Sequence, residues 1–341
     1  MRVPDLRVAV IGAGYWGPNL VLNFSEAPGA NVVAVADLSA ERLVSIAKRF
    51  PAVRTTQDHR ELLADPAIDA VCIVTPISTH RPLAEEALAA GKHVFVEKPL
   101  AGTVADAEAI ARAAERAGRT LMVGHTFVYN PAVTQVRALL ERGDLGKVQY
   151  IDSQRVNLGL HQFDFNVLWD LGPHDVSISL YWLDEEPEWV QCIGACFVQP
   201  EIEDVVFLTL GFPSGALAQA HLSWLAPSKL RRMAVIGSKK MAVYDDTEAA
   251  EKVKIYDHGV ESLSVEELRR SYRAGDIHSP RVPVTEALQL EVRHFIECIR
   301  DGATPRSGGE AGIRVVRVLE AGMRSLRRQG ARVAYREVAP V

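Results

Sequence analysis

Three short groups of residues in this chain contain the residue types that can move a hydride and a proton together. They are Gly12-Ala13-Gly14-Tyr15-Trp16-Gly17, Glu97-Lys98-Pro99, and the pair Asp170 and His174. Glycines at this spacing can hold a dinucleotide. A lysine can polarise a hydroxyl or carbonyl oxygen, and a histidine beside a carboxylate can take the hydroxyl proton. The combination predicts a dehydrogenase.

The glycine-rich run lies where a dinucleotide site requires it, between a strand and a helix. Residues 6–11 form an apolar run typical of a parallel strand, and Pro18 suits the first turn of a helix. Gly12 permits a tight turn, Gly14 leaves room for a pyrophosphate, and Gly17 lets the helix approach the strand. We therefore expect residues 12–17, including Tyr15 and Trp16, to bind the cofactor. The alternative is a turn that uses glycine only for packing.

An acidic residue follows the next expected strand. Asp37 comes directly after residues 31–36, about twenty residues beyond the last glycine, where a carboxylate can bind the ribose hydroxyls of adenosine. A negative charge there disfavours a 2′-phosphate, so the cofactor is predicted to be NAD. Arg42 lies one helical turn further on and could reach a 2′-phosphate, which keeps NADP possible. The alternative for Arg42 is a solvated helix residue.

Two further strand ends carry candidate cofactor residues. Thr75, Pro76 and His80 follow the apolar residues 69–74, and Glu97 and Lys98 close residues 92–96. Ligands bind at the carboxyl ends of parallel strands, so we expect all five residues to contact the cofactor. The bond between Lys98 and Pro99 is a candidate cis peptide. The alternatives are Thr79 as a helix cap with a surface histidine beside it, and a solvated lysine before a turn.

Asp170 and His174 are four residues apart and would share one face of a helix. The carboxylate would raise the basicity of the imidazole and fix its tautomer, as a general base requires. Pro173 is compatible with this if the helix begins shortly before it. Asp175 is expected to make local hydrogen bonds. The alternative is a capping aspartate and an ordinary interior histidine.

The order of the expected elements predicts two domains. Strands and helices alternate through residues 6–124, which indicates a doubly wound parallel sheet of the Rossmann type. Residues 188–256 read instead as an antiparallel meander. We place a cofactor-binding domain at residues 1–126 and an α+β domain with a large open antiparallel sheet at residues 127–341. The few remaining helices cannot cover that sheet, so a homo-oligomer, dimer or tetramer, is expected.

Composition excludes several classes of protein. The net charge of −5 is not that of a general nucleic-acid binder, and no apolar run is long enough to span a bilayer. The chain begins without a charged segment followed by an apolar one, so a secretory signal is not expected and a cytoplasmic location is. Its four cysteines lack zinc-ligand spacing and are expected to be free thiols, and no metal site is predicted.

These motifs together resemble the Gfo/Idh/MocA oxidoreductases (glucose–fructose oxidoreductase, inositol dehydrogenase, MocA) over essentially the whole chain. The matching pieces are residues 12–17, Thr75-Pro76 with His80, Glu97-Lys98-Pro99, and Asp170 with His174. The resemblance implies a Rossmann domain, a second α+β domain and sheet-mediated oligomers. It also implies that Lys98 and His174 face the substrate carbon and that Asp170 assists them.

A narrower resemblance rests on residues 155–159 and 166–175. These are similar to the nucleotide-sugar 3-dehydrogenases, which oxidise the C3 hydroxyl of UDP-N-acetylglucosamine or of its uronic acid. The resemblance adds Arg155 and Asn157 to Lys98, Asp170 and His174 as expected substrate-binding residues. Gly172 stands where many members of that branch have alanine. Alternatives are a dTDP-sugar 3-ketoreductase using NADPH, a dehydrogenase of a free sugar or cyclitol, and a non-enzymatic NAD sensor.

Overall fold

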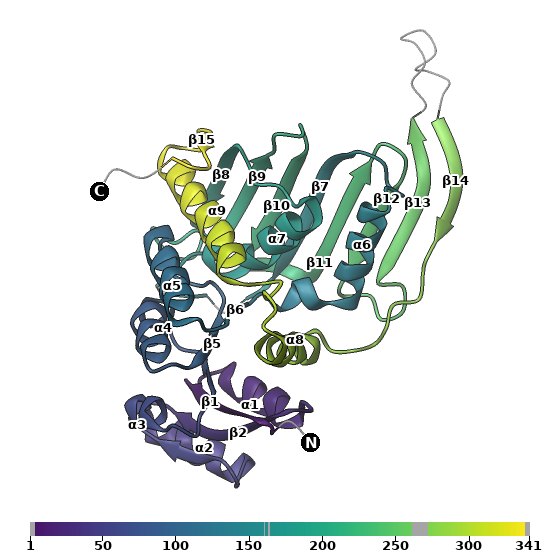
Figure 1. Cartoon of the computed structure of the whole chain (residues 1–341). Helices are drawn as coiled ribbons and strands as arrows, with labels where there is room; N and C mark the ends of the chain where they lie inside the picture. Colours follow the sequence, from purple (N-terminus) through teal and green to yellow (C-terminus); the bar gives the residue numbers. More distant parts are fainter. Residues whose placement is uncertain (1–3, 160, 163, 261–271, 338–341) are drawn as a thin grey trace. The chain divides into compact units, whose positions relative to one another are not determined.

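The computed structural model describes residues 4–159, 161–162, 164–260 and 272–337, and the chain folds into two compact units (Figure 1). The first unit comprises Met1–Tyr129 and Thr285–Val316, and the second comprises Asn130–Val284 and Arg317–Val341. The boundary expected at residue 126 divides the chain once, so it did not include the return of residues 285–316 to the first unit. Within the described ranges, no helix is long and apolar enough to cross a membrane.

The first unit contains the predicted parallel sheet, with strand order β3-β2-β1-β4-β5-β6. Its strands are β1 (Leu6–Ile11), β2 (Ala30–Ala36), β3 (Arg54–Thr56), β4 (Ala70–Ile73), β5 (His93–Glu97) and β6 (Leu121–Gly124). Its helices are α1 (Gly17–Glu26), α2 (Ala40–Arg49), α3 (His59–Ala64), α4 (His80–Ala89), α5 (Val104–Ala117) and α8 (Ala287–Asp301). The strand order reverses between β1 and β4, which is where doubly wound sheets bind their ligands.

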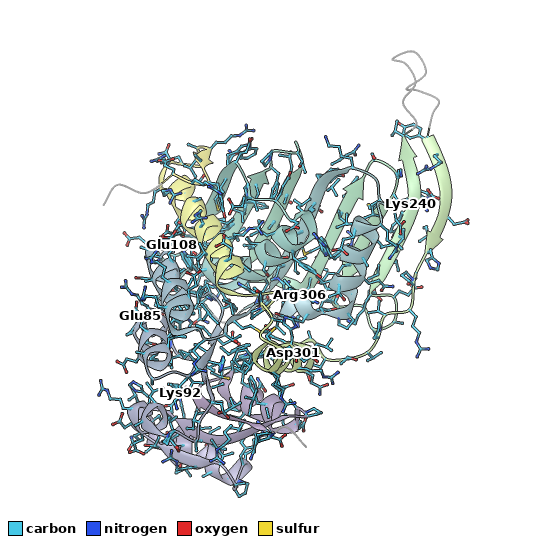
Figure 2. The ribbon with its side chains drawn as sticks, in the orientation of Figure 1. Glu85, Lys92, Glu108, Lys240, Asp301 and Arg306 are labelled. Atoms are coloured by element: carbon cyan, nitrogen blue, oxygen red, sulfur yellow. The ribbon has the colours of Figure 1, made fainter. Side chains whose placement is uncertain are left out.

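The helix α8 belongs to this unit because its apolar face completes the core. Phe295 of α8, Phe24 of α1 and Phe95 of β5 pack edge to face, with ring centroids 5.8–6.2 Å apart. Beyond α8, Arg306 donates a hydrogen bond to a backbone carbonyl of the short helix η2 (Thr126–Tyr129), and its guanidinium lies over the ring of Tyr129 (Arg306 is labelled in Figure 2). The end of β6 and α8 are therefore fastened together.

The second unit is built on a nine-stranded sheet of order β14-β13-β12-β11-β7-β10-β9-β8-β15. The strands are β7 (Val148–Leu158), β8 (Trp189–Ala195), β9 (Val205–Gly211), β10 (Leu217–Ser223), β11 (Leu225–Gly237), β12 (Met241–Asp245), β13 (Val253–Val260), β14 (Tyr272–His278) and β15 (Val333–Ala334). The predicted meander is wrong at one place. The strand β7 lies between β10 and β11, and β7 and β10 run parallel, so the sheet is mixed although mostly antiparallel.

Helices of the second unit pack on one face of this sheet. They are α6 (Pro131–Glu141), α7 (Val167–Leu183) and the part of α9 (Gly309–Arg327) that belongs to this unit (Figure 1). Burial alternates along the strands accordingly: Leu208 and Leu222 are buried, whereas Phe207 and Leu217 are exposed. Phe207 stacks on its cross-strand neighbour His221, with ring centroids 4.5 Å apart. The uncovered face therefore carries large apolar side chains on adjacent strands.

This open face leads us to expect a homo-oligomer in which sheet packs on sheet, because exposed apolar patches normally mark association surfaces. Replacement Phe207→Glu would place a charge in that patch and should shift the protein towards monomers. Light scattering at micromolar concentration measures this, with Thr209→Glu on the same strand as a test of how far the interface extends. An unmodified protein that is monomeric under these conditions would contradict the expectation.

Candidate active site

The glycine-rich turn between β1 and α1 is built by close backbone approaches. Gly12 has a φ of +106°, and a Cβ there would lie 2.3 Å from the carbonyl oxygen of Val74. A Cβ on Gly17 would lie 2.2 Å from the carbonyl oxygen of Gly12, whereas one on Gly14 would point into open space. Two glycines are thus required by packing, and Gly14 leaves the approach to the α1 N-terminus clear. These residues fit a bound pyrophosphate.

The carboxylate of Asp37 is fixed at the end of β2. Its Oδ2 accepts a hydrogen bond from the Ala13 N–H (2.6 Å) and its Oδ1 accepts one from the Ser39 N–H (2.8 Å). Nη1 of Arg42 lies 3.6 Å from Oδ2, and the Arg42 side chain is well exposed. A surface hollow beside Asp37 is lined also by Leu38 and Arg42. The glycine-rich turn and the predicted ribose-binding carboxylate are therefore one hydrogen-bonded structure, which fits an adenosine ribose.

The loop after β4 is fixed by a buried histidine. His80 is 1% exposed, and its two ring nitrogens lie 3.0 Å from the carbonyl oxygen of Pro99 and 2.8 Å from that of Thr75. Burial lowers the pKa of His80, which favours the neutral ring. The side chain of Thr79 bonds to Thr75 and to the Pro76 carbonyl rather than capping α4. His80 thus joins the loops after β4 and β5, which favours a positioning role; direct contact with the cofactor stays a prediction.

The end of β5 places Glu97 and Lys98 at the same edge of the sheet, and the peptide bond from Lys98 to Pro99 is cis, as expected. Oε2 of Glu97 accepts a hydrogen bond from the Lys98 N–H (3.0 Å), and the carboxyl group of Glu97 accepts another from the side chain of Trp16. Tyr15 is 90% exposed and Trp16 36% exposed. The glycine-rich turn and the Glu97-Lys98-Pro99 motif are therefore in contact, as one cofactor site requires.

Two titratable residues at this edge were missed by the sequence analysis. They are His125, which directly follows β6, and Glu291 of α8, which are 1% and 0% exposed. His125 could have been found by extending the strand-end argument to the last parallel strand. Glu291 carries no sequence signal, because it stands on an apolar helix face and reaches the site only through the return of α8.

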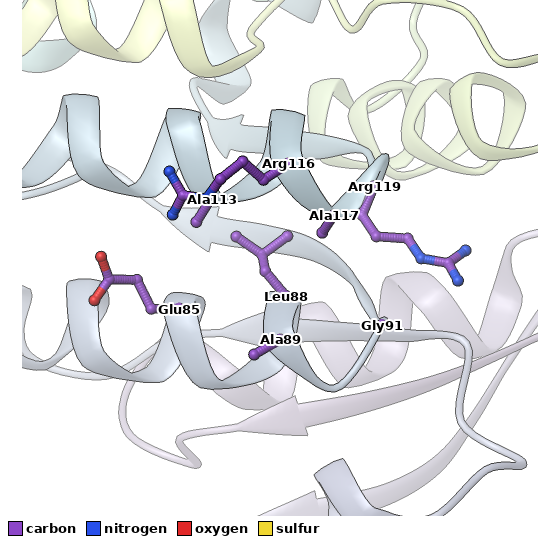
Figure 3. A pocket seen from close by; sticks show the side chains of 8 residues that line it. All are labelled: Glu85, Leu88, Ala89, Gly91, Ala113, Arg116, Ala117 and Arg119. Carbon is purple, nitrogen blue, oxygen red and sulfur yellow. The ribbon is translucent and has the colours of Figure 1, made fainter.

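A surface pocket lies between α4 and α5, near the amino ends of the strands of the same sheet (Figure 3). Its walls come from the last turns of both helices, with Leu88 and Ala113 at its base and Glu85, Arg116 and Arg119 around it. These helix ends lead into the amino ends of β5 and β6. None of the predicted site residues lines this pocket, which favours the carboxyl edge as the functional one.

In the second unit, Asp170 and His174 lie four residues apart on α7 and both are half-buried. The helix begins earlier than expected, at Val167, because the Asn166 side chain caps it by accepting a hydrogen bond from the Trp169 N–H. Pro173 therefore stands in the second turn, where it removes the N–H that would bond to the Trp169 carbonyl. The predicted pair keeps its spacing on one helix face.

A tryptophan that the sequence analysis did not single out orients the carboxylate. Nε1 of Trp224 donates a hydrogen bond to Oδ2 of Asp170 (3.0 Å), and Trp224 is 1% exposed. The ring of His161 lies 5.4 Å from the Trp224 ring. A rigid, buried donor holds the Asp170 carboxylate in one orientation on the helix that carries His174. This arrangement suits an aspartate that supports a histidine base.

The predicted substrate residues on β7 lie in different surroundings. Arg155 is 3% exposed and its Nε donates a hydrogen bond to Asp175, which also accepts one from the Ser153 hydroxyl. Asn157 is half-buried near the end of the same strand. The buried pair favours a structural role for Arg155, and its contact with substrate stays a prediction. The expectation of local hydrogen bonds at Asp175 is wrong, because its partners lie on the distant strand β7.

Comparison with known proteins identifies the fold family. Residues 6–125 match the model of an oxidoreductase family with an NAD-binding Rossmann fold, and residues 133–243 match the Gfo/Idh/MocA C-terminal domain. The scyllo-inositol 2-dehydrogenase (NAD(+)) of Bacillus subtilis is 30% identical over 316 residues, which cover 88% of each chain.

Two solved structures extend this similarity. The UDP-N-acetylglucosamine 3-dehydrogenase GnnA of Acidithiobacillus ferrooxidans is 25% identical, with a TM-score of 0.83 over 96% of this chain and 99% of that one. GenD2 from gentamicin A biosynthesis, solved in complex with NAD, is 25% identical, with a TM-score of 0.82 over 98% and 97% of the two chains. The present chain therefore belongs to the Gfo/Idh/MocA family and is an NAD(P)-dependent dehydrogenase acting on a CH–OH group, with an NAD-binding Rossmann domain.

Proposed function

We propose that this dehydrogenase oxidises the C3 hydroxyl of a nucleotide-linked sugar, with a UDP-N-acetyl sugar favoured, to the 3-keto sugar. The observation that carries the acid–base part is the pair on α7, in which Trp224 orients Asp170 one helical turn from His174. The similarity to a UDP-N-acetylglucosamine 3-dehydrogenase over nearly the full length of both chains supports the substrate class.

The proposed mechanism divides the work among three side chains. NAD, when bound, supplies the acceptor for the hydride from C3. His174 takes the hydroxyl proton, and Asp170 stabilises the resulting positive charge on the imidazole. Lys98 donates to the same oxygen and stabilises the negative charge that develops as the proton leaves.

We propose NAD as the preferred dinucleotide. The Asp37 carboxylate is fixed by two backbone N–H groups at the end of β2, where it can accept the hydroxyls of the adenosine ribose. The negative charge of Asp37 would repel a 2′-phosphate. Arg42, which could bind that phosphate, is already paired with the Asp37 carboxylate. A cytoplasmic location stays a prediction.

A free cyclitol is the second candidate substrate, and one observation favours it: the scyllo-inositol 2-dehydrogenase relative is the more similar in sequence. A dTDP-sugar 3-ketoreductase using NADPH and an NAD sensor without catalysis are the remaining alternatives. Turnover with UDP-N-acetylglucosamine, its uronic acid, dTDP-3-ketosugars and scyllo-inositol, followed by absorbance of NADH or NADPH, separates these four functions.

The cofactor preference is tested by Asp37→Ala. Loss of the ribose contacts should weaken NAD binding roughly tenfold, as expected for one or two hydrogen bonds to a charged group, and should change NADP binding less. The ratio of the two dissociation constants measures the effect, and Glu41→Gln on the first turn of α2 is the control for loss of a nearby charge. Tighter binding of NADP than NAD by the unmodified protein would overturn the proposal and assign Arg42 to the phosphate.

The chemistry is tested by His174→Asn and Lys98→Met. Each should retain dinucleotide binding and slow hydride transfer by about 10²–10⁴-fold, because a positioned base or charge is lost. Asp170→Asn should slow it less if the carboxylate only orients and supports the imidazole. Single-turnover NADH formation from a UDP-N-acetyl sugar with deuterium at C3 measures the step.

The isotope effect provides the control for this experiment. A larger primary effect in the His174 variant than in the unmodified enzyme would show that chemistry has become the slow step. Near-normal single-turnover rates in both the His174 and the Lys98 variants would show that the active site lies elsewhere.

A further inference from the structure

Two carboxyl groups with buried oxygen atoms contact the segment that leaves the carboxyl edge of the parallel sheet. Glu97 of β5 is paired in register with Gly124 of β6, and a Cβ on Gly124 would lie only 3.0 Å from Oε1 of Glu97. Two residues along the chain, the Thr126 hydroxyl donates a hydrogen bond to Oε2 of Glu291 (2.7 Å). The segment from Gly124 to Thr126 therefore touches one carboxyl group at each end and holds His125 between them.

Several polar atoms of this cluster have no hydrogen-bond partner in the part of the chain that the structure describes. They are Oε1 of Glu97, Oε1 of Glu291 and both ring nitrogens of His125. A buried polar atom without a partner is costly, and a buried charge more so. The cluster is therefore poised to exchange protons rather than to carry two fixed negative charges.

The electrostatics of the pair follow from burial and mutual repulsion. Burial raises the pKa of Glu97 to about 7, against the opposing effect of Lys98, and burial and the charge of Glu97 raise the pKa of Glu291 well above its usual value. Like charges in one buried site cannot both ionise readily. Near neutral pH the pair therefore keeps at least one proton.

Apart from Lys98, the other titratable groups that face the pair stay neutral near pH 7. Burial raises the pKa of the Cys72 thiol of β4, which faces both carboxyl groups, and that of Tyr129, which faces Glu291. Burial and the charge of Lys98 lower the pKa of His125 to about 3. Lys98 is the cation that faces Glu97. The carboxyl pair is thus the group of this cluster that titrates near neutral pH.

We propose that Glu97, with the carboxyl group of Glu291 held on the same segment, changes its protonation with the charge of the bound cofactor, so that it takes up a proton from solvent when NADH replaces NAD⁺. The nicotinamide ring carries a positive charge in NAD⁺ and none in NADH. Loss of that charge removes an attraction that favours the ionised carboxylate, which then accepts a proton to become the neutral acid. The inference rests on the proposed assignment of Glu97 and Lys98 to the cofactor site.

The direct test counts protons by titration calorimetry of the full chain with NAD⁺ and with NADH at pH 7, in buffers of different ionisation enthalpy. NADH binding should take up more protons than NAD⁺ binding, by up to about half a proton, because a group with a pKa near 7 is half ionised at this pH. The ratio of NADH to NAD⁺ affinity should correspondingly fall as pH rises from 6 to 8.

Glu97→Gln removes the carboxyl group that takes up the proton and keeps a side chain of nearly the same size. The difference in proton uptake between NADH and NAD⁺ binding at pH 7 should then fall towards zero. Glu297→Gln removes the same formal charge from an exposed position of α8 and should leave the difference unchanged. Thermal unfolding of both variants checks that each is folded.

Equal proton counts for NAD⁺ and NADH in the unmodified protein would overturn the inference, as would an unchanged difference in Glu97→Gln. The proton counts of the unmodified protein keep the test decisive should the Glu97 variant fail to fold. The titrations contain no sugar, so they test the carboxyl pair even if the proposed substrate is wrong. Conversely, dinucleotide binding without a difference in proton uptake would reject the role of the carboxyl pair and would not affect the proposed reaction.

Discussion

The parallel pairing of β1, β4, β5 and β6 is the constraint on which the cofactor site depends. Parallel strands share one carboxyl edge, so the residues that follow them are brought together although they are far apart in the sequence. Gly12, Thr75, Lys98 and His125 each follow or end one of these strands. The close approach of the Gly12 and Val74 backbones exists because β1 and β4 are direct neighbours. Placement of the glycine turn is thus a consequence of sheet order.

The same edge is rich in buried polar groups, some with hydrogen-bond partners and some without. Some are satisfied by neighbours: both ring nitrogens of His80 lie within hydrogen-bond distance of backbone carbonyls, to one of which a neutral ring donates, and Asp37 accepts from two N–H groups. Others, on Glu97, His125 and Glu291, keep buried atoms that no described residue satisfies. Satisfied groups give rigidity, whereas the others retain the ability to change protonation. The first kind positions the site, and the second kind is available for proton chemistry.

In the second unit the candidate base depends on helix capping and on an indole. Asn166 starts α7 early enough that Asp170 and His174 both stand within regular helix despite Pro173. Trp224, which immediately follows β10, fixes the carboxylate from outside the helix. The insertion of β7 between β10 and β11 sets where this tryptophan lies relative to the sheet, so the mixed strand order contributes to the site as well as to the fold.

The elements whose signals are local could be predicted from the residues alone. Hydrophobic runs predicted the parallel strands, and residue types and spacing predicted the glycine turn and the position of Asp37 after the second strand. Features that depend on residues far apart in the sequence could not be predicted and are seen only in the folded chain. These are the parallel pairing of β7 with β10, the burial of Arg155 against Asp175, the return of α8, and the hydrogen bond between Thr126 and Glu291. Local patterns specify which face of a helix or strand is apolar. Long-range packing specifies which other element that face contacts. The contacting element in turn sets the desolvation and the neighbouring charges of a buried side chain.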